Sequence, residues 1–180
     1  MKQLLKVHAF VAILLAGIGI AHAAPEQPLE QDARAALNAL YESSPGAKAL
    51  GEKAKGILVF PDIRKAAFIV GAQSGQGVMF ANGKVSGHYR ADGGLVGLEA
   101  GAQSFAYVMF FMSDSALRNL RSNKGFEIGA DPNIVIVDAG AAKEISSTTA
   151  QADVYGYVFN QKGLMGGIAL QGLKITRVHG

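Results

Sequence analysis

Cysteine is absent from the 180-residue sequence, and this absence restricts how the protein is stabilised and attached. No disulfide can form, so the fold has to be stabilised by its own hydrophobic core. Lipid attachment at a signal-peptide junction requires a cysteine thiol, which excludes a lipoprotein. Glycine, by contrast, is abundant, and the 23 glycines fall inside apolar alternating stretches. That placement indicates tight, bent strands and not a flexible linker.

Groups that support catalysis are also scarce. Beyond residue 23 the only histidines are His88 and His179, and His88 is interpreted as a half-buried scaffold residue in a strand. No cluster of His, Cys and carboxylates has the spacing of metal ligands. The glycines do not form a Walker loop either, because five residues and not four separate Gly77 from Gly83. The sequence therefore predicts a protein that is not an enzyme and has no metal or cofactor.

The N-terminal segment has the pattern of a secretory signal peptide. Lys2 and Lys6 form a basic start, and residues 21–23 are the small-x-small sequence that a signal peptidase accepts. The uninterrupted apolar run over residues 9–21 is shorter than the roughly 20 residues that span a bilayer. We therefore expect cleavage after Ala23, in preference to an uncleaved membrane anchor.

Cleavage changes the charge of the protein. Loss of Lys2 and Lys6 lowers the formal net charge from +3 to +1, so no general attraction to nucleic acid follows. We expect residues 1–23 to be the signal peptide, 24–28 a short tether and 29–180 one domain. The expected location is the periplasm, with the domain either free there or peripheral to a membrane.

Helical spacing of apolar residues predicts two helices after the tether. The first has an apolar stripe from Leu29 to Tyr41, which we expect to pack on the domain and not to enter a membrane. Ser44 is the expected N-cap of the second helix and Pro45 its first residue, and this helix should run to about Lys55.

Short apolar segments then predict many strands. Pro61 should end the first of them, and Asn82-Gly83 is a strong hairpin signal. Residues 71–80 and 101–110 are identical at seven of ten positions, which indicates two similar strand pairs in one curved sheet. The expected strands are 56–61, 66–70, 77–81, 84–89, 95–103, 105–111, 134–138, 155–160 and 164–178.

One further helix should interrupt these strands. Ser113 or Asp114 is its expected cap, Leu117 and Leu120 should face inward, and Gly125 should close it. The predicted fold class is therefore α+β, with a curved, mainly antiparallel sheet or barrel-like core, two N-terminal helices and one inserted helix.

Several glycine-anchored blocks resemble the SYLF-domain family. They lie in residues 68–78, 89–103, 131–135 and 155–172 and follow one another in the family's order. This resemblance implies lipid binding. Eukaryotic members bind phosphoinositides and in some cases actin, whereas Tyr89-Arg90-Ala91-Asp92 here replaces their usual Trp-Ser-x-Pro block. This departure and the expected location favour ordinary anionic phospholipid as the ligand.

A basic surface is the candidate lipid-binding site. A cluster of Lys and Arg near an anionic lipid surface gains about 1 kcal/mol per residue. The competing interpretation is ordinary solvation, with Glu52 pairing with lysines on its helix and Asp62 neutralising Arg64 or Lys65. The candidate residues are Lys48, Lys53, Lys55, Arg64 and Lys65.

The sequence thus predicts a non-catalytic module that binds lipid at a membrane surface in the periplasm, with a phospholipid membrane and no nucleic acid as its partner. The alternative function is a cell-envelope interaction or scaffold module that binds a protein and no lipid. A third possibility is a carrier with an apolar cavity inside the sheet.

Overall fold

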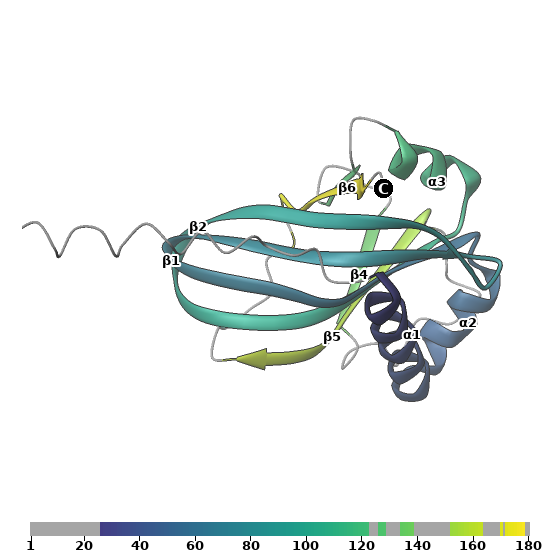
Figure 1. Cartoon of the computed structure of the whole chain (residues 1–180), viewed down its shortest axis with the longest axis horizontal. Helices are drawn as coiled ribbons and strands as arrows, with labels where there is room; N and C mark the ends of the chain where they lie inside the picture. The colour runs from purple at the N-terminus through teal and green to yellow at the C-terminus, as the bar shows by residue number, and fades with distance from the viewer. Residues whose placement is uncertain are drawn as a thin grey trace, which may run out of the picture.

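The computed structural model describes residues 26–122, 126–128, 134–138, 152–163, 170 and 172–178. The predicted signal peptide, residues 1–23, lies outside this range. The described part has an α+β architecture in which helices flank a curved, mainly antiparallel sheet (Figure 1). The predicted fold class is confirmed.

The first two helices form where the sequence places them. Helix α1 covers Glu26–Ser43, so it begins inside the stretch that was expected to be a tether. Helix α2 covers Pro45–Lys53, and the Ser44 side chain accepts a hydrogen bond from the Ala47 amide at 3.3 Å. The N-cap and the proline at the first helical position are thus as predicted.

Two long strands replace the series of short ones that the sequence suggested. Strand β1 covers Gly56–Ala81 and β2 covers Lys84–Phe111, and they pair antiparallel along their length. The turn between them is the predicted Asn-Gly hairpin, with φ of 51° and 73°. Pro61 does not end β1, because a register shift between Phe60 and Ile63 accommodates it.

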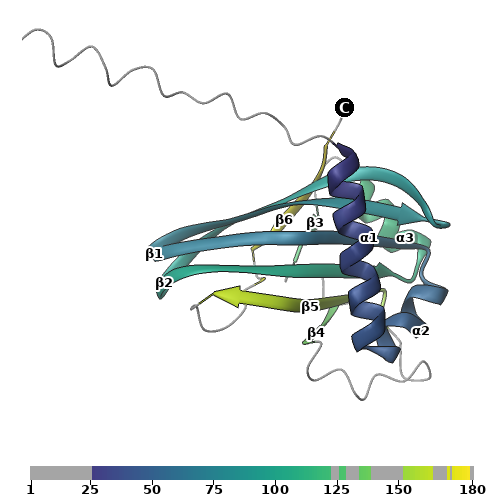
Figure 2. The same cartoon turned by 60° about the horizontal axis from the view of Figure 1, so that its bottom comes forward.

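Strand β1 folds back on itself near its midpoint, and glycines make this possible. A Cβ on Gly71 would clash with the Ala66 carbonyl oxygen, and one on Gly77 would lie 2.6 Å from the Phe60 ring. The two halves of β1 therefore face each other across a space that only glycine leaves open. Figures 1 and 2 show β1 and β2 turning back together at one end of the molecule. We call Phe68, Ile69 and Val70, at this turn, the apex.

The remaining strands extend the edge of β2 that β1 leaves open, with β6 along residues 88–92 and β5 along residues 103–111. The order in the sheet is β3-β6-β2-β5-β4, with β1 also paired to β2. Strand β4 is parallel to β5, while the other pairs are antiparallel. The bounds are Phe126–Glu127 for β3, Ile134–Asp138 for β4, Val154–Gly163 for β5 and Lys174–Val178 for β6.

Helix α3, Asp114–Arg121, is the inserted helix, and Ser113 is its N-cap. Its Leu117 and Leu120 are buried, as expected. The helix ends earlier than predicted, with Ser122 at its C-cap, and Gly125 lies outside the described residues.

Two hydrophobic cores lie on the two faces of the sheet. The inner core includes Phe60, Tyr107 and Met109, together with the apolar face of α3. The outer core includes Val59, Val78 and Phe110 and is covered by α1 and α2, whose Leu40 and Leu50 pack into it (Figure 2).

Candidate functional site

The five predicted basic residues do not form one surface. Lys48, Lys53 and Lys55 are exposed on α2 or just after it, whereas Arg64 lies on β1. Lys65 is buried, with 1% of its surface exposed. Neighbouring residues of a strand point to opposite faces, so Arg64 faces solvent and Lys65 faces the interior. The expectation that Lys65 lies on the surface was wrong.

Two separate groups of surface cations remain. The three lysines at α2 form no ion pair with a carboxylate in the part of the chain that the structure describes. They lie at the end of the molecule opposite the apex (Figure 1). Arg64 pairs with Asp62, with 2.7 Å between Nε and Oδ2, as the solvation interpretation anticipated.

A third feature, which the sequence analysis missed, is the apolar surface of the apex. Phe68 is 76% exposed, Ile69 56% and Val70 67%. Sequence reasoning placed these residues in a strand, and three large apolar residues in a row are typical of a buried one. The available signal was the small residues on either side of them, Ala66-Ala67 and Gly71-Ala72.

The backbone holds this apolar surface outward. Ile69 has φ of 67°, a conformation that is unfavourable for a β-branched residue. It lies at the register shift between Phe68 and Val70, where β1 bends back. The two halves of β1 are in contact beneath the bend, so large side chains have no interior to enter.

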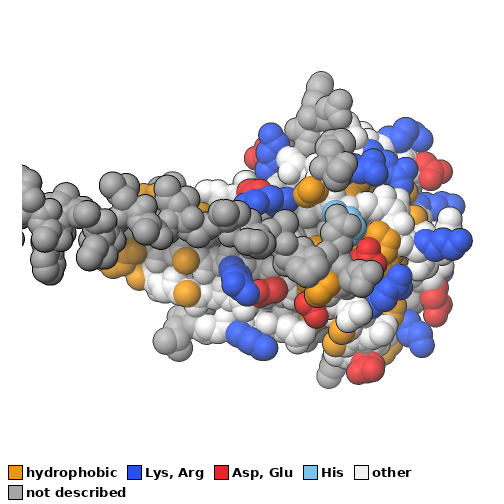
Figure 3. Space-filling model, viewed as in Figure 1, with side chains coloured by type: hydrophobic (Ala, Val, Ile, Leu, Met, Phe, Trp, Pro, Cys, Tyr) orange, Lys and Arg blue, Asp and Glu red, His pale blue; other side chains and the backbone are white. Residues whose placement is uncertain are grey.

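The segment around the apex and its register partners carry no charge. Residues 66–72 contain only Ala, Gly, Phe, Ile and Val, and their register partners on β2 are residues 94–96 and 100–102, which are also uncharged. Glu99 lies between these two groups of partners in the sequence. Figure 3 shows hydrophobic side chains gathered at this end of the molecule, while most of the Lys and Arg visible on the same face lie toward the other end.

Two exposed cations lie closest to the apex along the strands, in one row that crosses β1, β2 and β5. Arg64 on β1 pairs in register with Ser104 on β2, which in turn pairs with Lys162 on β5. Register partners point to the same face of a sheet, and both cations are exposed. Four residues of strand separate Arg64 from Phe68, which corresponds to about 13 Å.

Polar contacts join several side chains on the other half of the hairpin. Arg90 Nε lies 2.7 Å from Asp92 Oδ2, and the Ser74 hydroxyl donates to Asp92 Oδ1 at 2.8 Å. His88 Nε2 lies 3.5 Å from Glu30 Oε1 of α1. These contacts tie strands and helix together. Arg121 and Arg177 both donate to Ser86, at 3.5 Å, and form no ion pair with a carboxylate among the described residues.

Two features of other protein classes are not found in the described residues. They contain no group of three or more His, Cys, Asp or Glu side chains that could hold a metal ion. None of the helices described is long and apolar enough to cross a membrane.

The described residues form an α+β domain built on a doubled-back hairpin. Residues 92–179 match the Ysc84 family, described as "Las17-binding protein actin regulator". The matched segment begins in β2 and includes α3 and the four short strands. This match is consistent with the SYLF-domain family, which the sequence blocks resemble. A comparison with curated proteins found no match.

Proposed function

We propose that this domain binds the surface of a membrane by inserting its apex, and that it does so in the periplasm with a preference for anionic phospholipid. The observation that supports this proposal is the exposure of Phe68, Ile69 and Val70 within a segment, residues 66–72, that carries no charged side chain. The expected secretion signal in residues 1–23 supports the location.

The energetics favour a lipid interface as the environment of the apex. Full burial of a Val, Ile or Phe side chain gains about 1.5–3 kcal/mol. An interfacial apolar face typically enters the boundary between headgroups and acyl chains by about 5–10 Å. Small residues flank the apex along β1, so its three large side chains protrude beyond their neighbours on that strand. Insertion therefore removes three large apolar side chains from water without burying a charge of residues 66–72.

The row formed by Arg64 and Lys162 supports the preference for anionic lipid. With the apex inserted, these side chains lie about 13 Å back along the strands, near the level of the headgroups. Each cation near an anionic surface gains about 1 kcal/mol. Asp62 reduces the contribution of Arg64, so Lys162 carries the larger share.

Vesicle flotation tests the proposal. Purified protein is mixed with vesicles of zwitterionic phospholipid alone or with added anionic phospholipid. The Phe68→Ser, Val70→Ser double variant should lose most binding to both kinds of vesicle. The Arg64→Gln, Lys162→Gln variant should lose only the extra binding that anionic lipid provides.

A matched control separates insertion of the apex from nonspecific adsorption of exposed apolar side chains to the vesicles. Val135 and Ile136 on β4 are also exposed, at 42% and 46%. Val135→Ser, Ile136→Ser should float like the wild type, and circular dichroism should show that all variants are folded. Wild-type flotation by the apex variant would contradict the proposal. If the Lys48→Gln, Lys53→Gln, Lys55→Gln triple variant alone lost vesicle binding, the lipid-binding site would be assigned to α2 instead.

The expected export has its own test. Residues 1–23 are fused to alkaline phosphatase, which is active only after it reaches an oxidising compartment. We expect an active fusion, and inactivity would contradict the periplasmic location without affecting the lipid assay.

Protein binding is the second candidate function. The description of the matched family names a protein ligand, which favours it. A domain of this kind would retain a partner in pull-down experiments regardless of added vesicles and would fail to float with either lipid.

A further inference from the structure

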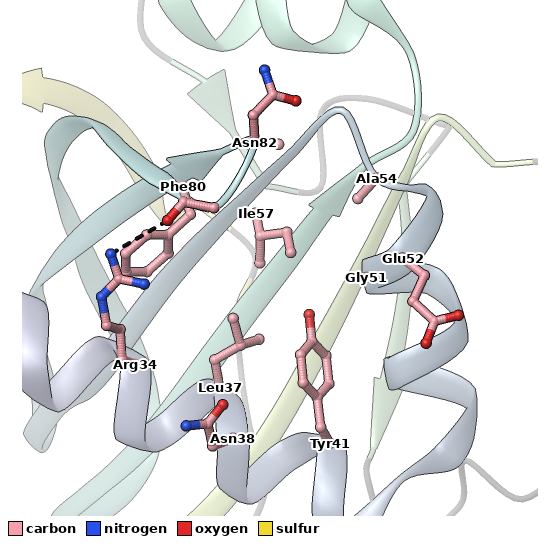
Figure 4. Close-up of a pocket in the computed structure, with 12 residues that line it drawn as sticks. Arg34, Leu37, Asn38, Tyr41, Gly51, Glu52, Ala54, Ile57, Phe80 and Asn82 are labelled. Atoms are coloured by element: carbon pink, nitrogen blue, oxygen red, sulfur yellow. Dashed lines mark hydrogen bonds between the residues drawn. The ribbon is translucent and has the colours of Figure 1, made fainter.

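A groove lies at the end of the molecule opposite the apex, between α1, α2 and the β1–β2 turn. Its volume is about 430 Å³, within the usual range of ligand sites. Arg34, Leu37, Asn38 and Tyr41 line it from α1, at the spacing that places residues on one helix face. The opposite walls come from the end of α2, the start of β1 and the hairpin turn (Figure 4).

The middle of this groove is apolar. Leu37, Tyr41 and Ile57 point toward one another across it (Figure 4), and Ala54 lies at its edge. The Tyr41 ring is stacked on Phe110 of the outer core, with 6.3 Å between the ring centroids. The floor is therefore continuous with the packed outer core and suited to hydrocarbon.

One end of the groove carries a positioned cation. The Arg34 guanidinium carbon lies 4.7 Å from the centroid of the Phe80 ring, and Nη2 donates to the Gly83 carbonyl oxygen at 3.4 Å. No carboxylate forms an ion pair with Arg34 within the described residues. Most of its N–H donors therefore remain available in the planar arrangement that suits a carboxylate.

The other end of the groove carries the opposite charge. Glu52 lines the groove beside Tyr41. Burial and the charge of Glu52 raise the pKa of Tyr41 to about 12, so its hydroxyl is neutral at physiological pH. A second anionic group of a ligand would meet Glu52 and be repelled.

We propose that this groove binds an amphiphile with a single negative charge, its carboxylate on Arg34 and its hydrocarbon chain along Leu37 and Tyr41. This site is separate from the apex and needs no membrane. It would give the domain a soluble lipid-like ligand in addition to the bilayer surface of the proposed function.

Calorimetric titration without vesicles tests the site with three probes of equal chain length: decanoate, decanol and decanedioate. The wild type should bind decanoate most tightly, because only this probe combines one charge with a free apolar end. Arg34→Gln should weaken decanoate binding about tenfold or more, as expected for the loss of charge-assisted hydrogen bonds. It should leave decanol binding unchanged.

Further variants distinguish this site from other causes. Glu52→Gln should raise the affinity for decanedioate and leave that for decanoate nearly unchanged. Arg118→Gln removes an exposed cation of α3 and should have no effect, and the Phe68→Ser, Val70→Ser variant should bind decanoate normally. Equal affinity of the wild type and Arg34→Gln for decanoate, or no binding of any probe, would overturn the proposal.

Discussion

The two ends of the doubled-back hairpin differ in what covers their large apolar side chains. At the helical end, Val59, Val78 and Phe110 are fully buried because α1 and α2 lie over them. At the apex, residues of similar size are more than half exposed. The strands are continuous between the two ends, so strand identity does not decide burial. The difference shows that a sheet needs a second layer before large side chains stabilise it.

The space between the two halves of the folded hairpin also differs between its two ends. Near the helical end, aromatic rings such as Phe60 and Tyr107 fill the inner face and lie over Gly77 and Gly156. Near the apex, Gly71 lies against Ala67 with no space for a ring. Large apolar residues there have only the outside to occupy, which makes them available for binding.

The largest expected effect comes from removing the cover at the helical end. Leu40 of α1 is fully buried in the outer core, and Leu40→Ala should lower the free energy of unfolding by about 2–5 kcal/mol. Urea denaturation followed by circular dichroism measures the change. A loss below about 1 kcal/mol would show that the helices cover the sheet without stabilising it.

The next effect is expected where the halves of β1 meet. Gly71→Ala places a methyl group against the Ala66 carbonyl and the Ala67 side chain and should cost about 1–3 kcal/mol. Gly94 is the matched control, since a Cβ there would contact nothing within 4 Å. Denaturation should show Gly94→Ala close to the wild type. Equal stability of the two variants would contradict the close contact beneath the apex.

Alkaline pH should lower the stability of the fold mainly through tyrosines buried under the helices and in the inner core. Burial raises the pKa values of Tyr41, Tyr89, Tyr107 and Tyr157 above 10, and that of Tyr41 reaches about 12. A raised pKa means that the folded state holds its proton more tightly. The stabilisation is thus complete below pH 10 and is lost as the pH rises toward 12.

For Tyr41, which is half-buried, we expect this loss to be roughly 1 kcal/mol after allowance for solvent screening. Denaturation midpoints at pH 9 and pH 11.5 measure it, and tyrosinate absorbance follows ionisation. Tyr41→Phe should reduce the difference between the two midpoints. An unchanged difference would assign the alkaline effect to other groups.

The smallest effect on stability is expected at the apex itself. Phe68 is 76% exposed, so Phe68→Ala should change the free energy of unfolding by less than about 0.5 kcal/mol. The same variant should clearly weaken vesicle flotation. A destabilisation comparable to that of Leu40→Ala would mean that the apex is packed in solution, and the comparison between the two ends would fail.

The sequence by itself determined the features that depend on neighbouring residues. Ser44-Pro45 and Ser113 specify helix starts because a side-chain oxygen satisfies an amide within the same turn. Asn82-Gly83 specifies the hairpin because both residues accept positive φ. The family blocks were likewise readable, and residues 92–179 match the family.

Only the tertiary structure decided which residues lie inside and which outside. Pairing between β1 and β2 joined the short predicted strands and placed Lys65 in the interior and Arg64 at the surface. A separate pairing set β4 parallel to β5. The exposure of Phe68, Ile69 and Val70 follows from β1 folding back on itself. These outcomes depend on contacts between residues far apart in the chain, which set strand register and leave the apex without a covering layer.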